Sequence, residues 1–318
     1  MLNTKNILSI DDLSTDDIDT ILSNADFFLE VLDREVKKVP ALRGKTIVSL
    51  FFEPSTRTRT SFEIAGKRLN ADVVNFSPSM SSLKKGESII DTVRTILSMK
   101  VDLLIVRHSD SGIPKFISER VNIPVINAGD GTHEHPTQAL LDLYTIRKKF
   151  GSVEGLKVAI VGDILHSRVA KSNIKLFKKM KMEVILVAPS MLLPEKNYFD
   201  EKVKHSIDEV INKVDVLYML RMQFERQQNR LYPSIREYNR FLSLDIERFR
   251  RLKPESIVMH PGPVNRGIEI SGEVMDLIDK YPERIKIEEQ VSHGLAVRMA
   301  LIYLMLSLSS EDLDSTRS

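Results

Sequence analysis

One segment constrains the fold more than any other, the stretch at 46–66 that reads T-I-V-S-L-F-F-E-P-S-T-R-T-R-T-S-F-E-I-A-G. Its first part, Thr46 to Phe52, is an apolar, β-branched and aromatic run with the length of a buried strand, and Pro54 ends it. A helix is expected directly afterwards, because apolar residues recur at helical spacing at Phe62, Ala65 and Leu69. The segment therefore predicts a strand, a tight turn and a helix.

The predicted helix start carries Ser55, Thr56, Arg57 and Thr58. Free backbone N–H groups and the helix dipole attract anions at this position. Three hydroxyls and a guanidinium in the same turn suit a phosphate group. The alternative is a serine that only caps the helix, next to a solvated arginine.

The remaining chain alternates strand-like and helical segments, which predicts parallel sheets covered on both faces. Short buried strands are expected at 73–76, 102–107, 124–128, 157–162, 183–188, 215–220 and 256–260. Helices are expected at 136–150, with Pro136 at the first position, and near 87–99, 113–120, 167–180, 206–213, 244–251 and 294–308.

These elements predict an α/β fold of two tandem, doubly wound, parallel-sheet domains. We expect the last apolar helix to return to the first domain. The predicted domains are therefore 1–135 plus 291–318, and 136–290. Ligands of such sheets bind beyond the carboxyl ends of the strands, and we expect the active site in the cleft between the domains.

Composition excludes several classes of function. The 318 residues include no cysteine, which rules out disulfides, thiol catalysis and cysteine metal sites. A net charge of +2 gives no reason to expect nucleic acid or a membrane surface as a partner. No apolar run approaches the ~18 residues of a membrane span, so a cytoplasmic protein is expected. No acidic cluster or histidine pair indicates a metal, and no cofactor is expected.

Further candidates follow the predicted strands. Arg107 ends one strand and suits a ligand crevice or an ion pair. In H-E-H-P-T-Q, His135 can polarise a carbonyl group, whereas Gln138 has a capping box as its alternative role. The loop S-S-L-K-K-G-E-S at 81–88 is basic and has the composition of a solvated loop.

The second half offers donors of the same kind. Arg168 follows V-G-D-I-L-H-S, which lacks the G-x-G-x-x-G pattern and so disfavours a dinucleotide-binding oxidoreductase. Arg221 and Gln223 alternate on one face of an extended segment and suit a carboxylate. H-P-G-P-V-N-R-G at 260–267 is a stiff turn whose proline-rich backbone offers carbonyl acceptors.

The ordered set F-F-E-P-S-T-R-T, K-K-G-E, V-R-H, H-P-T-Q, V-G-D with S-R, R-x-Q-x-E-R and H-P-G-P-V-N-R-G resembles the catalytic chains of aspartate carbamoyltransferases over roughly 5–308. The resemblance implies that carbamoyl phosphate and L-aspartate give N-carbamoyl-L-aspartate and phosphate, an early step of pyrimidine synthesis. It implies that the phosphate and carbamoyl groups are bound by the following residues: Ser55, Thr56, Arg57, Thr58, Arg107, His135, Gln138 and the carbonyls of Pro261 and Gly262.

The same resemblance implies that the domain 1–135 plus 291–318 binds carbamoyl phosphate and that the domain 136–290 binds aspartate. It implies that Arg168, Arg221 and Gln223 bind the aspartate carboxylates. It implies that Ser82, or Ser81 in its place, and Lys85 reach in from a neighbouring subunit, so that the active unit is a homotrimer with shared sites. Thr58, Arg107, His135 and Lys85 are the residues implied in catalysis. Whether regulatory chains or a dihydroorotase bind the trimer stays open.

Two alternatives compete with this interpretation. Ornithine carbamoyltransferases share S-T-R-T and H-P-x-Q but usually carry H-C-L-P, whereas this chain has H-P-G-P and no cysteine. A non-catalytic scaffold relative is the other alternative, although every matched position carries a chemically competent residue. No side chain is an obvious base, and the leaving phosphate is the expected acceptor of the amine proton.

Overall fold

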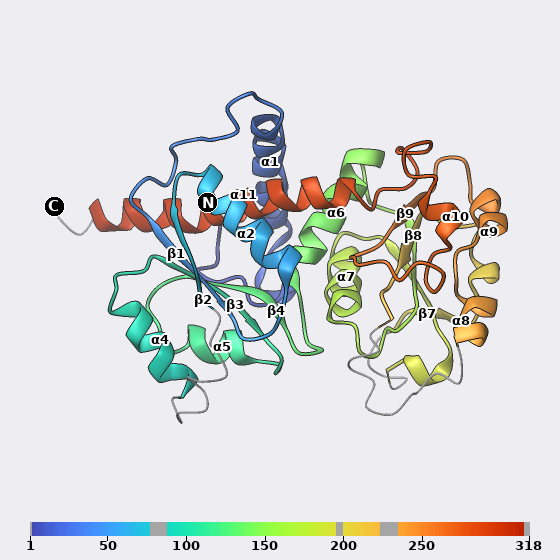
Figure 1. The fold of residues 1–318 in the computed structure, drawn as a ribbon, viewed down its shortest axis with the longest axis horizontal. Coiled ribbons are helices and arrows are strands. Elements are labelled where there is room, and N and C mark those ends of the chain that lie inside the picture. The colour runs from blue at the N-terminus through green and yellow to red at the C-terminus, as the bar shows by residue number, and fades with distance from the viewer. Residues whose placement is uncertain (1, 77–87, 195–199, 223–234, 315–318) are drawn as a thin grey trace. The chain divides into compact units, whose positions relative to one another are not determined.

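The computed structural model describes residues 2–76, 88–194, 200–222 and 235–314, with side chains through residue 307. The chain forms two compact units (Figure 1), Met1–Tyr144 with Ser292–Ser318, and Thr145–Val291. The C-terminal helix thus belongs to the first unit. The predicted domain boundaries at 135/136 and 290/291 concern ligand binding and stay predictions.

The first unit is built on a four-stranded parallel sheet with the order β2-β1-β3-β4. Its strands are β1 (Thr46–Phe51), β2 (Asp72–Phe76), β3 (Leu103–His108) and β4 (Val125–Asp130). The strands that follow β1 in sequence lie on both sides of it, so the topological switch point falls between β1 and β3. The N-terminal segment extends the other edge, where Ile7 pairs in parallel with Ile126.

The second unit is built on a five-stranded parallel sheet with the order β7-β6-β5-β8-β9. Its strands are β5 (Lys157–Val161), β6 (Glu183–Val187), β7 (Lys202–Lys204), β8 (Val216–Met219) and β9 (Ile257–Met259). The switch point here lies between β5 and β8. The predicted fold class of two doubly wound parallel sheets is confirmed.

Helices cover both sheets (Figure 1). The helices of the first unit are η1 (Ile10–Asp12), α1 (Thr15–Leu32), α2 (Thr56–Arg68), α4 (Ile89–Leu97), α5 (Ile113–Ser118) and α11 (Glu289–Asp314), and α6 (Pro136–Phe150) contains the division between the units. The helices of the second unit are α7 (Arg168–Lys179), η2 (Ser190–Leu192), η3 (Ile207–Glu209), α8 (Ile235–Phe241), α9 (Ile246–Arg251) and α10 (Gly272–Met275).

The core of the first unit explains how α2 is held. Val48 and Leu50 of β1 pack on α4 and α5, on one face of the sheet. On the other face α2 approaches the sheet at Gly66, where a Cβ atom would lie 2.5 Å from Cγ2 of Val73. A larger residue at this position would displace the Val73 side chain or the helix, so glycine suits the close approach. The last turns of α2 therefore lie close against β1 and β2.

Two sequence-based predictions need correction. The segment at 73–76 is a strand but is not buried, because β2 is the edge strand of its sheet and Val74 is 51% exposed. The segment at 206–213 forms only the short 3₁₀ turn η3 instead of a helix. None of the helices within the described ranges is long and apolar enough to cross a membrane.

Candidate functional site

The carboxyl ends of β1 and β3 bring the first set of predicted residues together. Phe51 pairs with Arg107 in the parallel register, so that Arg107 lies beside the end of β1. The chain leaves β1 through Pro54 and enters α2 at Thr56, with Ser55 as the N-cap residue. Arg107 and the start of α2 therefore meet at the switch point, where ligands of doubly wound sheets bind.

The start of α2 keeps its hydrogen-bonding capacity. Ser55 has an extended backbone with φ −160°, and its side chain makes no capping hydrogen bond. Ser55 therefore occupies the N-cap position of the alternative interpretation but lacks the side-chain capping bond. Thr58 is buried within the first turn, and Thr56 and Arg57 are exposed. This combination leaves hydroxyl groups and helix N–H groups available to an anion.

The side chain of Arg107 is held in place from two sides. Its Nη1 donates to the carbonyl oxygen of Ala128 at 2.9 Å, and its Nη2 lies 2.7 Å from Oε1 of Glu53. The Arg107 side chain is 12% exposed, and that of Glu53 is 17% exposed. Sequence reasoning did not single out Glu53, although a carboxylate between a strand and a proline is a recognisable signal. Both predicted roles of Arg107, strand-end donor and ion-pair partner, are compatible with this geometry.

His135 and Gln138 lie at the start of α6. His135 directly precedes the helix, is 4% exposed, and has Nδ1 3.5 Å from Oγ1 of Thr137. The side chain of Gln138 donates from Nε2 to Oδ1 of Asp142 at 3.0 Å, one turn further along. It does not reach back to the helix start, so the predicted capping-box alternative for Gln138 is wrong.

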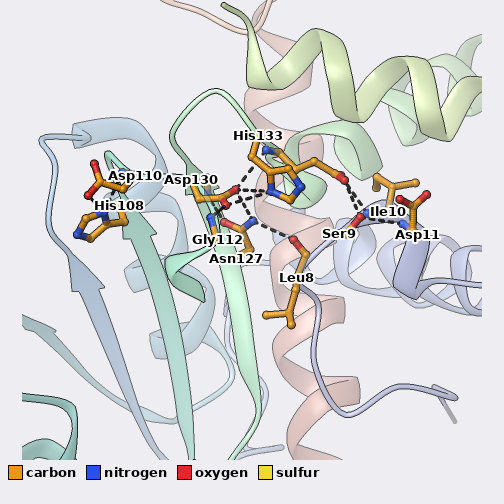
Figure 2. Close-up of polar contacts among 12 residues, drawn as sticks. Leu8, Ser9, Ile10, Asp11, His108, Asp110, Gly112, Asn127, Asp130 and His133 are labelled. Carbon is orange, nitrogen blue, oxygen red and sulfur yellow. Dashed lines mark hydrogen bonds and ion pairs between the residues drawn. The ribbon is translucent and has the colours of Figure 1, made fainter. Parts of the chain in front are cut away.

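Two buried carboxylates, Asp130 and Glu134, hold the loop that leads to His135, and Figure 2 shows the contacts of Asp130. Asp130 accepts hydrogen bonds from the Gly112 amide at 2.7 Å and from Asn127 Nδ2 at 2.9 Å. Burial raises the pKa of Asp130, but hydrogen bonds from His133, Gly112 and Asn127 outweigh it and lower the pKa below 3.8. The loop is therefore fixed by an ionised side chain.

The second carboxylate ties this loop to the N-terminal segment. Glu134 is completely buried and accepts from Ser9 Oγ at 2.5 Å and from the Ile10 amide at 3.0 Å. Leu8 adds its carbonyl oxygen, which accepts from Asn127 Nδ2 at 2.9 Å (Figure 2). Sequence reasoning missed Glu134, because its partners lie more than 120 positions earlier in the chain.

In the second unit the candidate residues also follow adjacent strands. Arg168 is the first residue of α7, after β5, and is 4% exposed. Ser167 caps this helix by accepting from the Ala170 amide at 3.1 Å. Arg221 follows β8, and β5 and β8 are paired neighbours. Arg168 and Arg221 therefore leave the sheet on both sides of its switch point.

Glu269 ties the end of β8 to the loop after β9. Its buried carboxylate accepts from the Met222 amide at 2.7 Å and from the Asn265 amide at 2.7 Å. Burial raises the pKa of Glu269 more than these hydrogen bonds lower it. Within the loop, the Gly262 amide donates to His260 Nδ1 at 2.8 Å. The turn that carries Pro261 and Gly262 is thus a fixed element.

The predicted residues Ser82 (with its alternative Ser81), Lys85 and Gln223 lie outside the described residues. Within the described ranges no cluster of histidine and carboxylate side chains has the arrangement of a metal site. The geometry gathers phosphate-type donors in the first unit and carboxylate-type donors in the second. The roles of the individual side chains stay predictions.

Comparison with known proteins agrees with this division. Residues 5–148 match the family model of the aspartate/ornithine carbamoyltransferase carbamoyl-P binding domain, and residues 154–305 match that of the Asp/Orn binding domain. The chain belongs to the aspartate/ornithine carbamoyltransferase family. The starts of α2 and α6 and Arg107 fall in the first family domain, and Arg168 and Arg221 fall in the second.

Curated relatives and solved structures narrow the comparison to one branch of the family. The chain is 52% identical over 304 residues to the aspartate carbamoyltransferase catalytic subunit of Syntrophotalea carbinolica, covering 95% of this chain and 96% of that one. It is 51% identical over 307 residues to that of Syntrophus aciditrophicus, covering 96% and 98%. The Trypanosoma cruzi aspartate transcarbamoylase in complex with carbamoyl phosphate is 33% identical, with a TM-score of 0.84 over 95% of this chain and 96% of that one.

Proposed function

We propose that this protein is an aspartate carbamoyltransferase, which transfers the carbamoyl group of carbamoyl phosphate to the amine of L-aspartate. The observation that carries the proposal is the meeting of the uncapped α2 start with Arg107 at a switch point, in a chain of this family. One solved relative, the aspartate transcarbamoylase of Trypanosoma cruzi, is in complex with both carbamoyl phosphate and aspartate. The products are phosphate and N-carbamoyl-L-aspartate, and we propose that the reaction is an early step of pyrimidine synthesis in the cytoplasm.

The proposed chemistry needs no covalent enzyme intermediate. The neutral amine of aspartate attacks the carbonyl carbon, the bond to the phosphate oxygen breaks, and phosphate leaves. The amine proton passes to the leaving phosphate. Two charges require stabilisation, the leaving phosphate and the oxyanion that develops on the carbonyl oxygen.

The side chains of the first unit suit both charges. Ser55, Thr56 and Arg57 would hold the phosphate at the start of α2. Thr58, Arg107 and His135 would donate to the carbonyl oxygen. The contacts of Arg107 with Glu53 and Ala128 fix its guanidinium before substrate binds, and such preorganisation strengthens transition-state stabilisation.

The second unit favours aspartate over ornithine. Arg168 and Arg221 are cations that follow neighbouring strands, and a second carboxylate on the substrate suits them. Ornithine carries a cationic side chain, which these arginines would repel. We propose that Gln223 and the carbonyls of Pro261 and Gly262 complete the recognition of the two substrates.

The assay follows directly from this proposal. The purified chain is incubated with carbamoyl phosphate and either aspartate or ornithine, and each carbamoyl amino acid is measured. Carbamoyl-aspartate is the expected product, and an Arg107→Ala variant should form it roughly 10²–10³-fold more slowly. A wild-type protein that carbamoylates ornithine, or neither amino acid, would disprove the assignment.

We further propose a homotrimer in which Ser82 and Lys85 complete the site of a neighbouring subunit. The test mixes an Arg57→Ala variant with a Lys85→Ala variant and lets their subunits exchange. Hybrid trimers contain some sites without either substitution, so activity should return. A mixture as inactive as its parents would contradict shared sites.

A further inference from the structure

The starting observation is the one-sided hydrogen bonding of the Gln138 amide. Gln138 is 9% exposed, and its Nε2 donates to Oδ1 of the completely buried Asp142 at 3.0 Å. Because an ionised carboxylate only accepts hydrogen bonds, the NH₂ end of the amide must face Asp142. The carbonyl oxygen of Gln138 then points the other way, and no hydrogen bond to it is found among the described residues.

Arg298 of α11 supplies the charge that matches Asp142. Burial lowers the pKa of Arg298 to about 10, against the opposing effect of the negative charge on Asp142, so the guanidinium stays protonated at neutral pH. Its Nη1 donates to Ser61 Oγ of α2 at 2.7 Å, and the group lies 5.1 Å from the ring centre of Phe62. The orientation of Gln138 therefore depends on a buried charge pair within the first unit.

Close packing of two helices brings this pair together. A Cβ atom at Gly294 would lie 2.9 Å from Cδ2 of Leu141 and 3.1 Å from Nη1 of Arg298. A larger residue would have to displace these two side chains, so the glycine lets α11 approach α6 closely enough for Arg298 to act on Asp142. Arg298 also links α6 to α2, because it interacts with Asp142 of α6 and donates to Ser61 of α2.

We propose that Asp142 is a positioning residue that decides which end of the Gln138 amide faces the substrate. With the NH₂ end held by Asp142, the carbonyl oxygen accepts a hydrogen bond from the NH₂ of the carbamoyl group. This inference rests on the proposed function. It adds a reason why the site selects a carbamoyl group over an acyl group. A carbamoyl group is thereby preferred over an acyl group, whose methyl would leave the Gln138 oxygen without a donor.

The preference can be measured with two ligands of nearly equal shape. Acetyl phosphate carries a methyl where carbamoyl phosphate carries NH₂. A lost hydrogen bond that leaves a buried acceptor unsatisfied predicts binding of acetyl phosphate about 5- to 150-fold weaker to the wild-type chain. The measurement is the ratio of the two dissociation constants by titration calorimetry on the full-length protein, without aspartate.

Asp142→Asn is the decisive variant, because an asparagine donates as well as accepts and no longer forces one orientation on Gln138. We expect the ratio to fall below that of wild type, toward that of Gln138→Leu, which has no acceptor at all. Combining Asp142→Asn with Gln138→Leu should give the ratio of Gln138→Leu alone, because Asp142 acts only through Gln138. Asp26→Asn is the matched control, since Asp26 accepts from Tyr144 of α6 at 2.9 Å without contacting Gln138, and its ratio should equal that of wild type.

A buried cation without its partner can prevent folding. The double variant Asp142→Asn with Arg298→Met removes both charges, and its ratio should also fall. A wild-type ratio in folded Asp142 variants, or an equal loss of affinity for both ligands, would overturn the inference and leave the proposed function intact. A wild-type chain that binds no carbamoyl phosphate would overturn both.

Discussion

Replacing Glu134 by alanine should loosen the N-terminal segment from the loop that precedes His135. The Glu134 carboxylate is completely buried and accepts from the Ser9 hydroxyl and from the amide of the fully buried Ile10. Alanine removes both acceptors, and the shortened side chain leaves the Ile10 amide without this partner. The segment still pairs with β4, because the Ile7 amide donates to Val125.

The magnitude follows from these two hydrogen bonds. A hydrogen bond to a charged group contributes about 1.5–3 kcal/mol, and an orphaned buried donor costs about 1–3 kcal/mol. Ser9 is half-buried, so water can replace part of its bond. The free energy of local opening should therefore fall by about 2–4 kcal/mol. This corresponds to an equilibrium constant for opening that is roughly 30- to 700-fold larger.

Amide hydrogen exchange of Ile7 and Ile10 measures this change, because protection reports the free energy of local opening. Glu134→Gln is the conservative control and should lose about 1 kcal/mol, since one oxygen remains for Ile10 and the Ser9 hydroxyl can accept from the new amide. Glu63→Ala removes a carboxylate that is hydrogen-bonded at the surface and should leave this exchange unchanged. Exchange in Glu134→Ala within about threefold of wild type would refute the reasoning.

Three further predictions concern activity and pH. His135→Ala should lower kcat by roughly 10²–10³-fold without selectively abolishing the alkaline limb of the pH profile, because the leaving phosphate takes the proton; steady-state rates from pH 6 to 10 test this. Asp130 has a lowered pKa, so its stabilisation is complete above 3.8 and is lost as the pH falls through its folded pKa; urea unfolding of Asp130→Asn should therefore vary less with pH in the acid range. Glu269 has a raised pKa, so its contribution has the opposite sign: it is complete below 4.5 and is lost as the pH rises through the folded value, and carbon NMR titration should find its midpoint above 4.5.

Local sequence patterns predicted the elements that carry the candidate site. The strand at 46–51, the helix start at Ser55 and the helix at 136–150 all occur as expected. These features depend on residues within a few positions of one another, such as a proline at a strand end or at a first helical turn. The same reasoning overestimated the helix at 206–213, because its apolar residues pack around a short 3₁₀ turn instead.

Burial depended on strand order, which local patterns do not contain. The segment at 73–76 has the composition of a buried strand, yet β2 lies at the edge of its sheet and is largely exposed. Periodicity reports which residues alternate or repeat, whereas an edge or central position is settled by which strands pair.

The sequence by itself determined the alternation of strands and helices, the family and the donor groups that follow each strand. Only the tertiary structure decided how those donors are oriented. Glu53 holds Arg107, Glu134 reaches back to Ser9, and Asp142 turns the amide of Gln138. The first two contacts join positions that are far apart in the sequence, and the third selects one of several possible partners for Gln138. A buried charge acquires its role only from the groups that the fold packs against it.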